Sequence, residues 1–180
     1  MQKKTKENIR TRCSAHIRYK NMSILIDTSP DIKTQMLNSK IKNVDAVIFT
    51  HPHADQTSGI FELRPFFWIN KKKIPIFGSK YTINQLKKTY DYCFYPKYGY
   101  VPILKSNIIK NNFSINKKNN KINFFSFEAQ HGMIKSTAFV FNKIAYISDC
   151  NKIPEKYLII LRNLDYLIID CFRVKKHPSH

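Results

Sequence analysis

Short runs of apolar residues, some alternating with polar ones and some continuous, recur along the chain and predict a series of strands. The runs at residues 12–19 and 22–27 flank Lys20 and Asn21, which predicts a hairpin. The same patterns predict two more hairpins, at residues 113–127 and 137–148, and single strands at residues 44–50, 74–77 and 164–170.

Between these strands the apolar spacing changes to that of helices. Ser29 and Pro30 have the residue types of a helix start, with Ser29 as the N-cap, so a helix is predicted from there to about Asn38. Residues 91–112 are rich in Tyr and Pro without a clear period, and we expect loop and strand there. Further helices are predicted at residues 57–63, 80–90 and 154–161.

The composition is that of one soluble domain. The chain has 180 residues, and its 43 % hydrophobic content supplies a core and excludes wholesale disorder. No apolar run approaches the ~20 residues of a membrane-spanning helix, and the N-terminal residues lack the apolar segment of a secretory signal. Four scattered cysteines without a Cys-x-x-Cys pair favour reduced thiols, so we expect a cytoplasmic protein.

The charge balance is strongly basic. The sequence holds 31 Lys and Arg against 12 Asp and Glu, a formal net charge of +19. Only six of the basic residues are Arg, whereas nucleic-acid-binding proteins more often cluster Arg with aromatic residues. We therefore interpret the lysines mainly as solvated surface and in part as attraction for an anionic substrate, with nucleic acid not favoured as a partner.

Residues with metal-binding chemistry come directly after predicted strands. His51, His53 and Asp55 follow one strand, and the end of a rigid strand can aim such side chains into one crevice. Imidazoles and carboxylates are ligands for divalent ions such as Zn²⁺ or Mn²⁺. Three of them within five residues indicate a metal site. His131 and Asp149 also follow strands and are candidates for the same site.

Two other polar residues have simpler interpretations. His16 lies in a predicted strand and is expected to make an ordinary surface hydrogen bond. Asp27 follows a strand, and two roles are open for it. It either caps the next helix or orients a metal-binding histidine through a hydrogen bond.

Several segments together resemble the metallo-β-lactamase superfamily, and within it the branch that contains the cyclic phosphodiesterase of phosphonate breakdown. The resemblance implies an α+β protein, an αββα sandwich of two sheets faced by helices, with metals at one edge. It implies a hydrolase domain at residues 8–180 behind a basic stub at residues 1–7. The segments that carry it are VDAVIFTHPHADQTSGIFELRPF, TRCSAHI, ILIDTSPDIKTQML, ISDCNKIPE, LDYLIIDCFR and HPSH.

The resemblance also implies roles for individual residues. In this branch three imidazoles hold one ion, a carboxylate bridges two ions, a second carboxylate serves the other ion, and a histidine near the substrate phosphate donates a proton to the leaving oxygen. The implied metal ligands here are His51, His53, His131, Asp149 and Asp55, the implied catalytic residues are Asp55 and His180, and Arg64 is implied to orient the loop or the substrate.

The sequence departs from this branch in three places. Gln56 stands where the branch has a histidine for the second metal, and a neutral amide oxygen is a weak ligand. Relatives continue beyond the position of His180 with a further metal-binding histidine, and they begin with a glycine-rich strand before residue 8. We therefore expect a sandwich that is incomplete at both edges, which favours association into a homo-oligomer.

The leading hypothesis is a metal-dependent phosphodiesterase that acts on a small, cyclic phosphodiester through a metal-bound hydroxide. Its cofactor would be Zn²⁺ or Mn²⁺, as one or two ions, with the second site weakened by Gln56. One alternative is a truncated relative without turnover. Another is an RNA-processing nuclease of the same superfamily, for which no RNA-binding arm is visible in the sequence.

Overall fold

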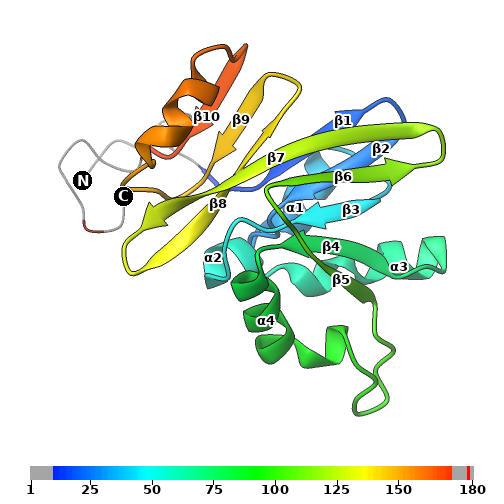
Figure 1. The fold of residues 1–180 in the computed structure, drawn as a ribbon. Coiled ribbons are helices and arrows are strands. Elements are labelled where there is room, and N and C mark those ends of the chain that lie inside the picture. The colour runs from blue at the N-terminus through cyan, green and yellow to red at the C-terminus, as the bar shows by residue number, and fades with distance from the viewer. Residues whose placement is uncertain (1–9, 172–177, 179–180) are drawn as a thin grey trace, which may run out of the picture.

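Two five-stranded sheets face each other in the computed structural model, which describes residues 10–171 and 178 (Figure 1). In the first sheet the strand order is β1-β2-β3-β4-β5. The hairpin strands β1 and β2 are antiparallel, and β2 to β5 run parallel. The bounds are β1 Ala15–Tyr19, β2 Met22–Ile26, β3 Ala46–Ile48, β4 Ile74–Gly78 and β5 Leu104–Ile108.

The second sheet has the order β10-β9-β8-β7-β6. Its strands are antiparallel except that β10 runs parallel to β9. All four residues of β10 are exposed, which leaves an apolar edge on this sheet among the described residues. The bounds are β6 Asn112–Lys117, β7 Asn120–His131, β8 Ile134–Phe141, β9 Ile144–Ile147 and β10 Tyr166–Ile169.

Helices cover the outer faces of the two sheets. The side of the first sheet away from the second carries most of them, and the second sheet is covered by one 3-10 helix, η4 (Figure 1). The bounds are α1 Ile32–Asn38, α2 Ala54–Thr57, η2 Ile60–Leu63, α3 Arg64–Asn70, α4 Lys80–Thr89, η3 Asp91–Cys93 and η4 Glu155–Leu161.

Three apolar clusters hold these layers together. One lies between the first sheet and its helices and includes Phe49 and Leu86, and a second lies between the two sheets and includes Ile48 and Phe139. The third packs Tyr157 of η4 against Phe127 on the outer face of the second sheet, where the two rings stack 4.5 Å apart. Burial of alternate strand residues on both faces is the main force that stabilises such a sandwich.

The predicted α+β sandwich and its three hairpins are confirmed. The predicted helix start is wrong by two residues. Residues 30 and 31 form a turn before α1, in which Ile32 N–H donates to the Ser29 carbonyl at 3.0 Å and Asp31 N–H donates to the Ser29 hydroxyl at 3.3 Å, so α1 begins only at Ile32. The helix predicted at residues 57–63 is instead split into α2 and η2, and α3, which the sequence did not indicate, follows directly.

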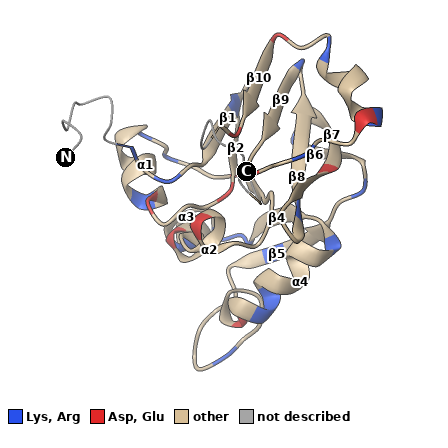
Figure 2. Ribbon diagram, turned by 90° about the vertical axis from the view of Figure 1, so that its left-hand side faces the viewer, with Lys and Arg blue, Asp and Glu red and all other residues tan. Residues whose placement is uncertain are grey.

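All four cysteines are free thiols, as expected. Within the described part of the chain, none of the helices is both long and apolar enough to cross a membrane. Figure 2 shows the basic residues scattered over many elements of both layers. This distribution fits a solvated surface better than one dedicated nucleic-acid-binding face.

Candidate metal centre

Three histidines from the two sheets converge at one end of the sandwich. His51 and His53 lie in the loop that joins β3 to α2, and His131 is the last residue of β7. His53 Nδ1 lies 3.1 Å from His51 Nε2 and 3.2 Å from His131 Nε2. One ring nitrogen from each therefore lies within 4.8 Å of the others, a spacing at which three imidazoles can share one ion. His51 and His131 are buried, whereas His53 is exposed and opens the cluster to solvent.

A chain of buried hydrogen bonds lies behind His51. The carboxylate of Asp27 accepts from the Thr50 backbone N–H at Oδ1 and from the Thr50 hydroxyl at Oδ2, both at 2.8 Å. Thr50 Oγ1 also lies 3.0 Å from His51 Nδ1. When Asp27 is ionised, the Thr50 hydroxyl donates its one proton to that carboxylate, so it accepts from Nδ1–H of His51. The lone pair of His51 is then on Nε2, which faces the other two histidines, so this residue set fits a metal ion.

Two carboxylates reach the centre from residues with left-handed backbone conformations. Asp27 follows β2 with a φ of 62°, and Asp149 follows β9 with a φ of 46°. Non-glycine residues rarely adopt this region, and the cost is often accepted at functional sites.

The loop after β2 packs tightly against the turn after α2. A Cβ on Gly59 would lie 2.2 Å from the Ser29 carbonyl oxygen, so only glycine fits there.

Asp149 lies beside the histidine cluster, and Asp55 is connected to it through Gln56. Asp149 Oδ2 is 3.6 Å from His51 Nε2 and accepts from Ser148 Oγ at 3.2 Å. The side-chain amide of Gln56 donates to Asp149 Oδ2 at 2.9 Å and lies 3.3 Å from Asp55 Oδ2. These two distances place the amide of Gln56 between the two carboxylates, and the Gln56 side chain is buried.

Burial controls the protonation of these acids. Desolvation raises the pKa of Asp149, and the negative charges of Asp55 and Asp170 raise it further. Desolvation also raises the pKa of Asp27 to about 8, against the lowering effect of its two hydrogen bonds from Thr50. A cation held nearby would lower the pKa of both acids, because a positive charge favours their ionised forms.

The structure brings together most of the residues that the sequence suggested. It places His51, His53 and His131 in one cluster, with Asp149 adjacent to it. Asp55 is connected to Asp149 through the side-chain amide of Gln56. Of the two roles open for Asp27, the capping one is wrong, since its carboxylate bonds to Thr50 and not to α1; Asp27 reaches His51 only through Thr50, and the orienting role stays a prediction. His16 makes the ordinary hydrogen bond expected of it, to Ser23 Oγ at 2.8 Å.

Two suggested residues do not join the cluster. The role implied for Arg64 is not supported, because its guanidinium lies over the rings of Phe61, Trp68 and Tyr100 at 5.5 to 5.8 Å, in an aromatic cluster of its own. Aromatic rings attract this cation, and they surround it in the segment after α2. The predicted proton donor His180 lies outside the described residues.

Two residues at the centre were missed from the sequence. Thr50 lies between Asp27 and His51, and Cys13 lies with its Sγ 3.2 Å from Gln56 Nε2. Desolvation raises the pKa of the Cys13 thiol, so the neutral form is favoured. The position of Thr50 next to a candidate ligand was an available signal. No local pattern linked Cys13 to a site formed by residues far along the chain.

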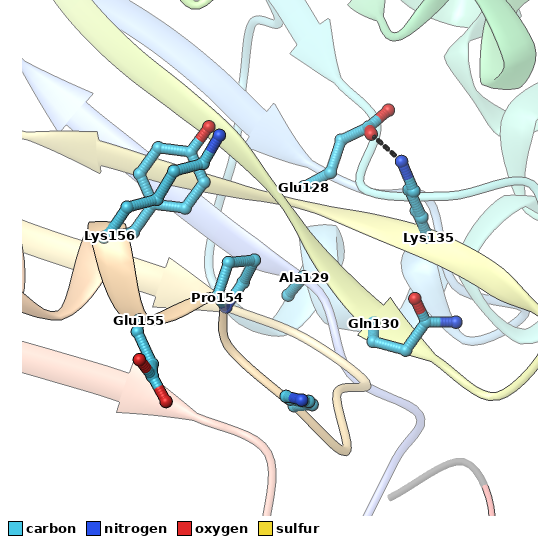
Figure 3. A pocket seen from close by; sticks show the side chains of 9 residues that line it. Glu128, Ala129, Gln130, Lys135, Pro154, Glu155 and Lys156 are labelled. Carbon is cyan, nitrogen blue, oxygen red and sulfur yellow. Dashed lines mark hydrogen bonds and ion pairs between the residues drawn. The ribbon is translucent and has the colours of Figure 1, made fainter.

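A pocket of about 520 Å³ is lined by residues of β7, β8 and η4 and of the segment before η4 (Figure 3). Gln130, the neighbour of His131, forms part of its wall, and the Glu128–Lys135 ion pair forms another part. The histidines themselves do not line it. Its charged lining consists of three lysines and two glutamates, namely Lys135, Lys152, Lys156, Glu128 and Glu155.

Comparison with known proteins agrees with this geometry. The family profile of the beta-lactamase superfamily domain matches residues 22–180. The chain belongs to the beta-lactamase superfamily. The predicted superfamily is thereby confirmed, and the metal centre lies in the part of the chain that the profile covers.

Solved structures of the superfamily share the fold. A diphosphatase from the PhnP family superposes with a TM-score of 0.83 at 30 % sequence identity, over 95 % of this chain and 64 % of that one. This likeness agrees with the predicted branch. The Zn²⁺-bound PqqB of Methylobacterium extorquens superposes with a TM-score of 0.65 at 16 % identity, over 89 % of this chain and 60 % of that one, which shows the shared fold.

A related sequence also belongs to a much longer protein. An octanoyltransferase of Porphyromonas gingivalis is 26 % identical over 159 residues, which are 87 % of this chain but 32 % of that protein. The chain therefore spans about a third of this relative and less than two thirds of the solved diphosphatase.

Proposed function

We propose that this protein is a metal-dependent hydrolase that cleaves a small phosphodiester. The observation that carries the proposal is the convergence of His51, His53 and His131, with the lone pair of His51 directed into the cluster by Thr50 and Asp27. Three neutral imidazoles held in this way are a ligand set for Zn²⁺ or Mn²⁺. Such an arrangement has little structural purpose without a cation.

The residues of the site would have separate roles in binding the ion and in transferring protons. The three histidines would hold the ion, and Asp149 would complete its ligands, since Oδ2 already lies 3.6 Å from His51 Nε2. A bound divalent ion supplies a Lewis acid that polarises a phosphoryl oxygen and activates water. Asp55 is half-buried at the edge of the cluster, and we propose that its carboxylate accepts a proton from the attacking water. His180 stays a proposed proton donor to the leaving oxygen.

The surroundings favour an anionic substrate. The net charge of +19 attracts anions to the protein as a whole. The diphosphatase of the PhnP family, with its TM-score of 0.83, is named for hydrolysis at phosphorus. These observations support a phosphorus ester as the substrate class, and the small share of Arg among the basic residues favours a small molecule over nucleic acid.

The experiment measures metal content and turnover of bis(p-nitrophenyl) phosphate on the same preparation of the full chain. The variant His53→Ala should lose both bound metal and turnover, whereas Asp55→Asn should keep the metal and lose at least tenfold in kcat. His16→Ala is the matched control, because His16 is exposed and hydrogen-bonded to Ser23, away from the cluster, and it should change neither quantity.

Each of the other outcomes decides between the hypotheses. Metal without turnover in the unmodified protein, on both phosphodiester and diphosphate substrates, would identify an inactive relative. Metal content that is unchanged in His53→Ala would refute the histidine centre itself.

A further inference from the structure

The amide of Gln56 lies at the middle of a group of side chains that otherwise serve as cation ligands. Its Nε2 is 2.9 Å from Asp149 Oδ2, 3.3 Å from Asp55 Oδ2 and 3.2 Å from Cys13 Sγ. Two carboxylates and a thiol around one point are a set that would suit a divalent ion. Here the atom at that point is a nitrogen that carries two protons.

The chemistry of the amide excludes an ion from the same position. An amide nitrogen donates hydrogen bonds and has no lone pair available for a metal. While Nε2 donates to Asp149 Oδ2 and Asp55 Oδ2, the space between these two oxygen atoms holds the amide and cannot hold an ion. The amide also replaces part of what a cation would do, because its N–H groups point positive charge density at two half-buried carboxylates.

The position of Gln56 is fixed by its backbone. Its N–H donates to the His53 carbonyl at 3.0 Å, and its carbonyl accepts from Thr28 N–H at 2.8 Å. The next turn is held by Gly59 N–H, which donates to the Thr28 carbonyl at 2.9 Å. The side chain is buried, so it has no solvent-filled space to move into. An ion could enter only by breaking these contacts.

The residues therefore do not fit the second ion that the superfamily resemblance implies next to Asp55. We propose that the centre binds one divalent ion per chain, and that the Gln56 amide takes the place of a second one. The inference rests on the proposed metal centre of His51, His53 and His131. It changes the role of Asp55, whose carboxylate is paired with an amide and is not a metal ligand.

The test is the number of ions bound by the full chain, measured by native mass spectrometry and by elemental analysis during a titration of metal-free protein with Zn²⁺. The unmodified protein should saturate at one ion per chain. Gln56→His, which supplies an imidazole and removes the amide, and Gln56→Ala, which only removes the amide, should allow a second ion. At least one of these variants should rise from one to two ions per chain.

The control is Gln35→His, which introduces an imidazole on α1, where Gln35 bonds to Ser14 and Ser29, and it should stay at one ion. Two ions on the unmodified protein would overturn the inference and leave the proposed function intact. No ion would overturn the metal centre and the proposed function with it. One ion on the unmodified protein and on both Gln56 variants would show that Gln56 is not what excludes the second ion, and would also overturn the inference. Circular dichroism on each variant confirms that the counted protein is folded.

Discussion

Replacing Asp27 by Asn tests whether the hydrogen-bond chain behind His51 decides metal affinity. The backbone N–H of Thr50 now donates to Oδ1 of residue 27 at 2.8 Å and would hold the amide oxygen of the Asn in the same place. The NH₂ group then faces the Thr50 hydroxyl and donates to it. Thr50 must turn its own proton towards His51 Nδ1, so His51 carries its proton on Nε2, the atom that faces His53.

The size of the effect follows from this rearrangement. To bind an ion, His51 in the Asp27→Asn variant must return to the other tautomer and lose one buried hydrogen bond, which costs about 1–3 kcal/mol. Because 1.4 kcal/mol is a factor of ten in an equilibrium constant, the Kd for the ion should rise roughly 5- to 150-fold. The fold should survive, since the substitution removes a buried carboxylate whose pKa burial raises to about 8.

The assay is a competition titration in which the protein and a chromogenic chelator share Zn²⁺. Asp45→Asn is the matched control, because Asp45 pairs with Lys117 at 2.8 Å and has no contact with the histidines. It should leave the Kd unchanged. An Asp27→Asn variant that is folded and binds Zn²⁺ as tightly as the unmodified protein would refute the role assigned to Asp27 and Thr50.

Three further predictions concern stability and charge. Gly59→Ala should lower the free energy of unfolding by about 1–3 kcal/mol or more in urea denaturation, because its Cβ would lie 2.2 Å from the Ser29 carbonyl, whereas Gly78→Ala, with contacts of 3.5 Å and more, should change it little. For the metal-free protein, the free energy of unfolding should fall as pH rises from about 4 towards 8, by up to ~1.4 kcal/mol per pH unit from Asp27, because the folded state binds the Asp27 proton more tightly than the unfolded chain; the slope should become less steep in Asp27→Asn. Arg64→Ala should leave metal content unchanged and cost about 0.5–1 kcal/mol, since its guanidinium contacts aromatic rings only; a loss of metal would contradict that placement.

Most strands of this fold could be predicted because they bury one face or both; β10, whose residues are all exposed, was visible only as an apolar run. The apolar runs that became β2, β3 and β4 are visible in the sequence without knowledge of their neighbours. The C-terminal end of the long strand β7 was harder to predict, because its last residues include the polar Glu128 and Gln130. Those residues pair with β8, and only that pairing extends the strand to His131.

The candidate centre, like the strands, could be predicted from the sequence only in part. His51 and His53 are close in sequence and could be predicted as a pair, and the resemblance to a known family added His131 and Asp149. The contacts of Gln56 could not be predicted, because they depend on where a loop near the N-terminus places Cys13 and where the end of β9 places Asp149. Hydrogen-bond partners that are 43 and 93 residues apart along the chain leave no local pattern.

The origin of the three histidines in both sheets has a mechanical consequence. His51 and His53 follow a strand of the first sheet and His131 ends a strand of the second, while Thr137 N–H of β8 donates to the Thr50 carbonyl at 2.8 Å across the same junction. An ion shared by these side chains would cross-link the two halves of the sandwich, so its binding free energy would add to their cohesion. At a free ion concentration one hundred times the Kd, this linkage amounts to about 2.7 kcal/mol. Chelation would then loosen the sandwich first at this end, where the two sheets are joined.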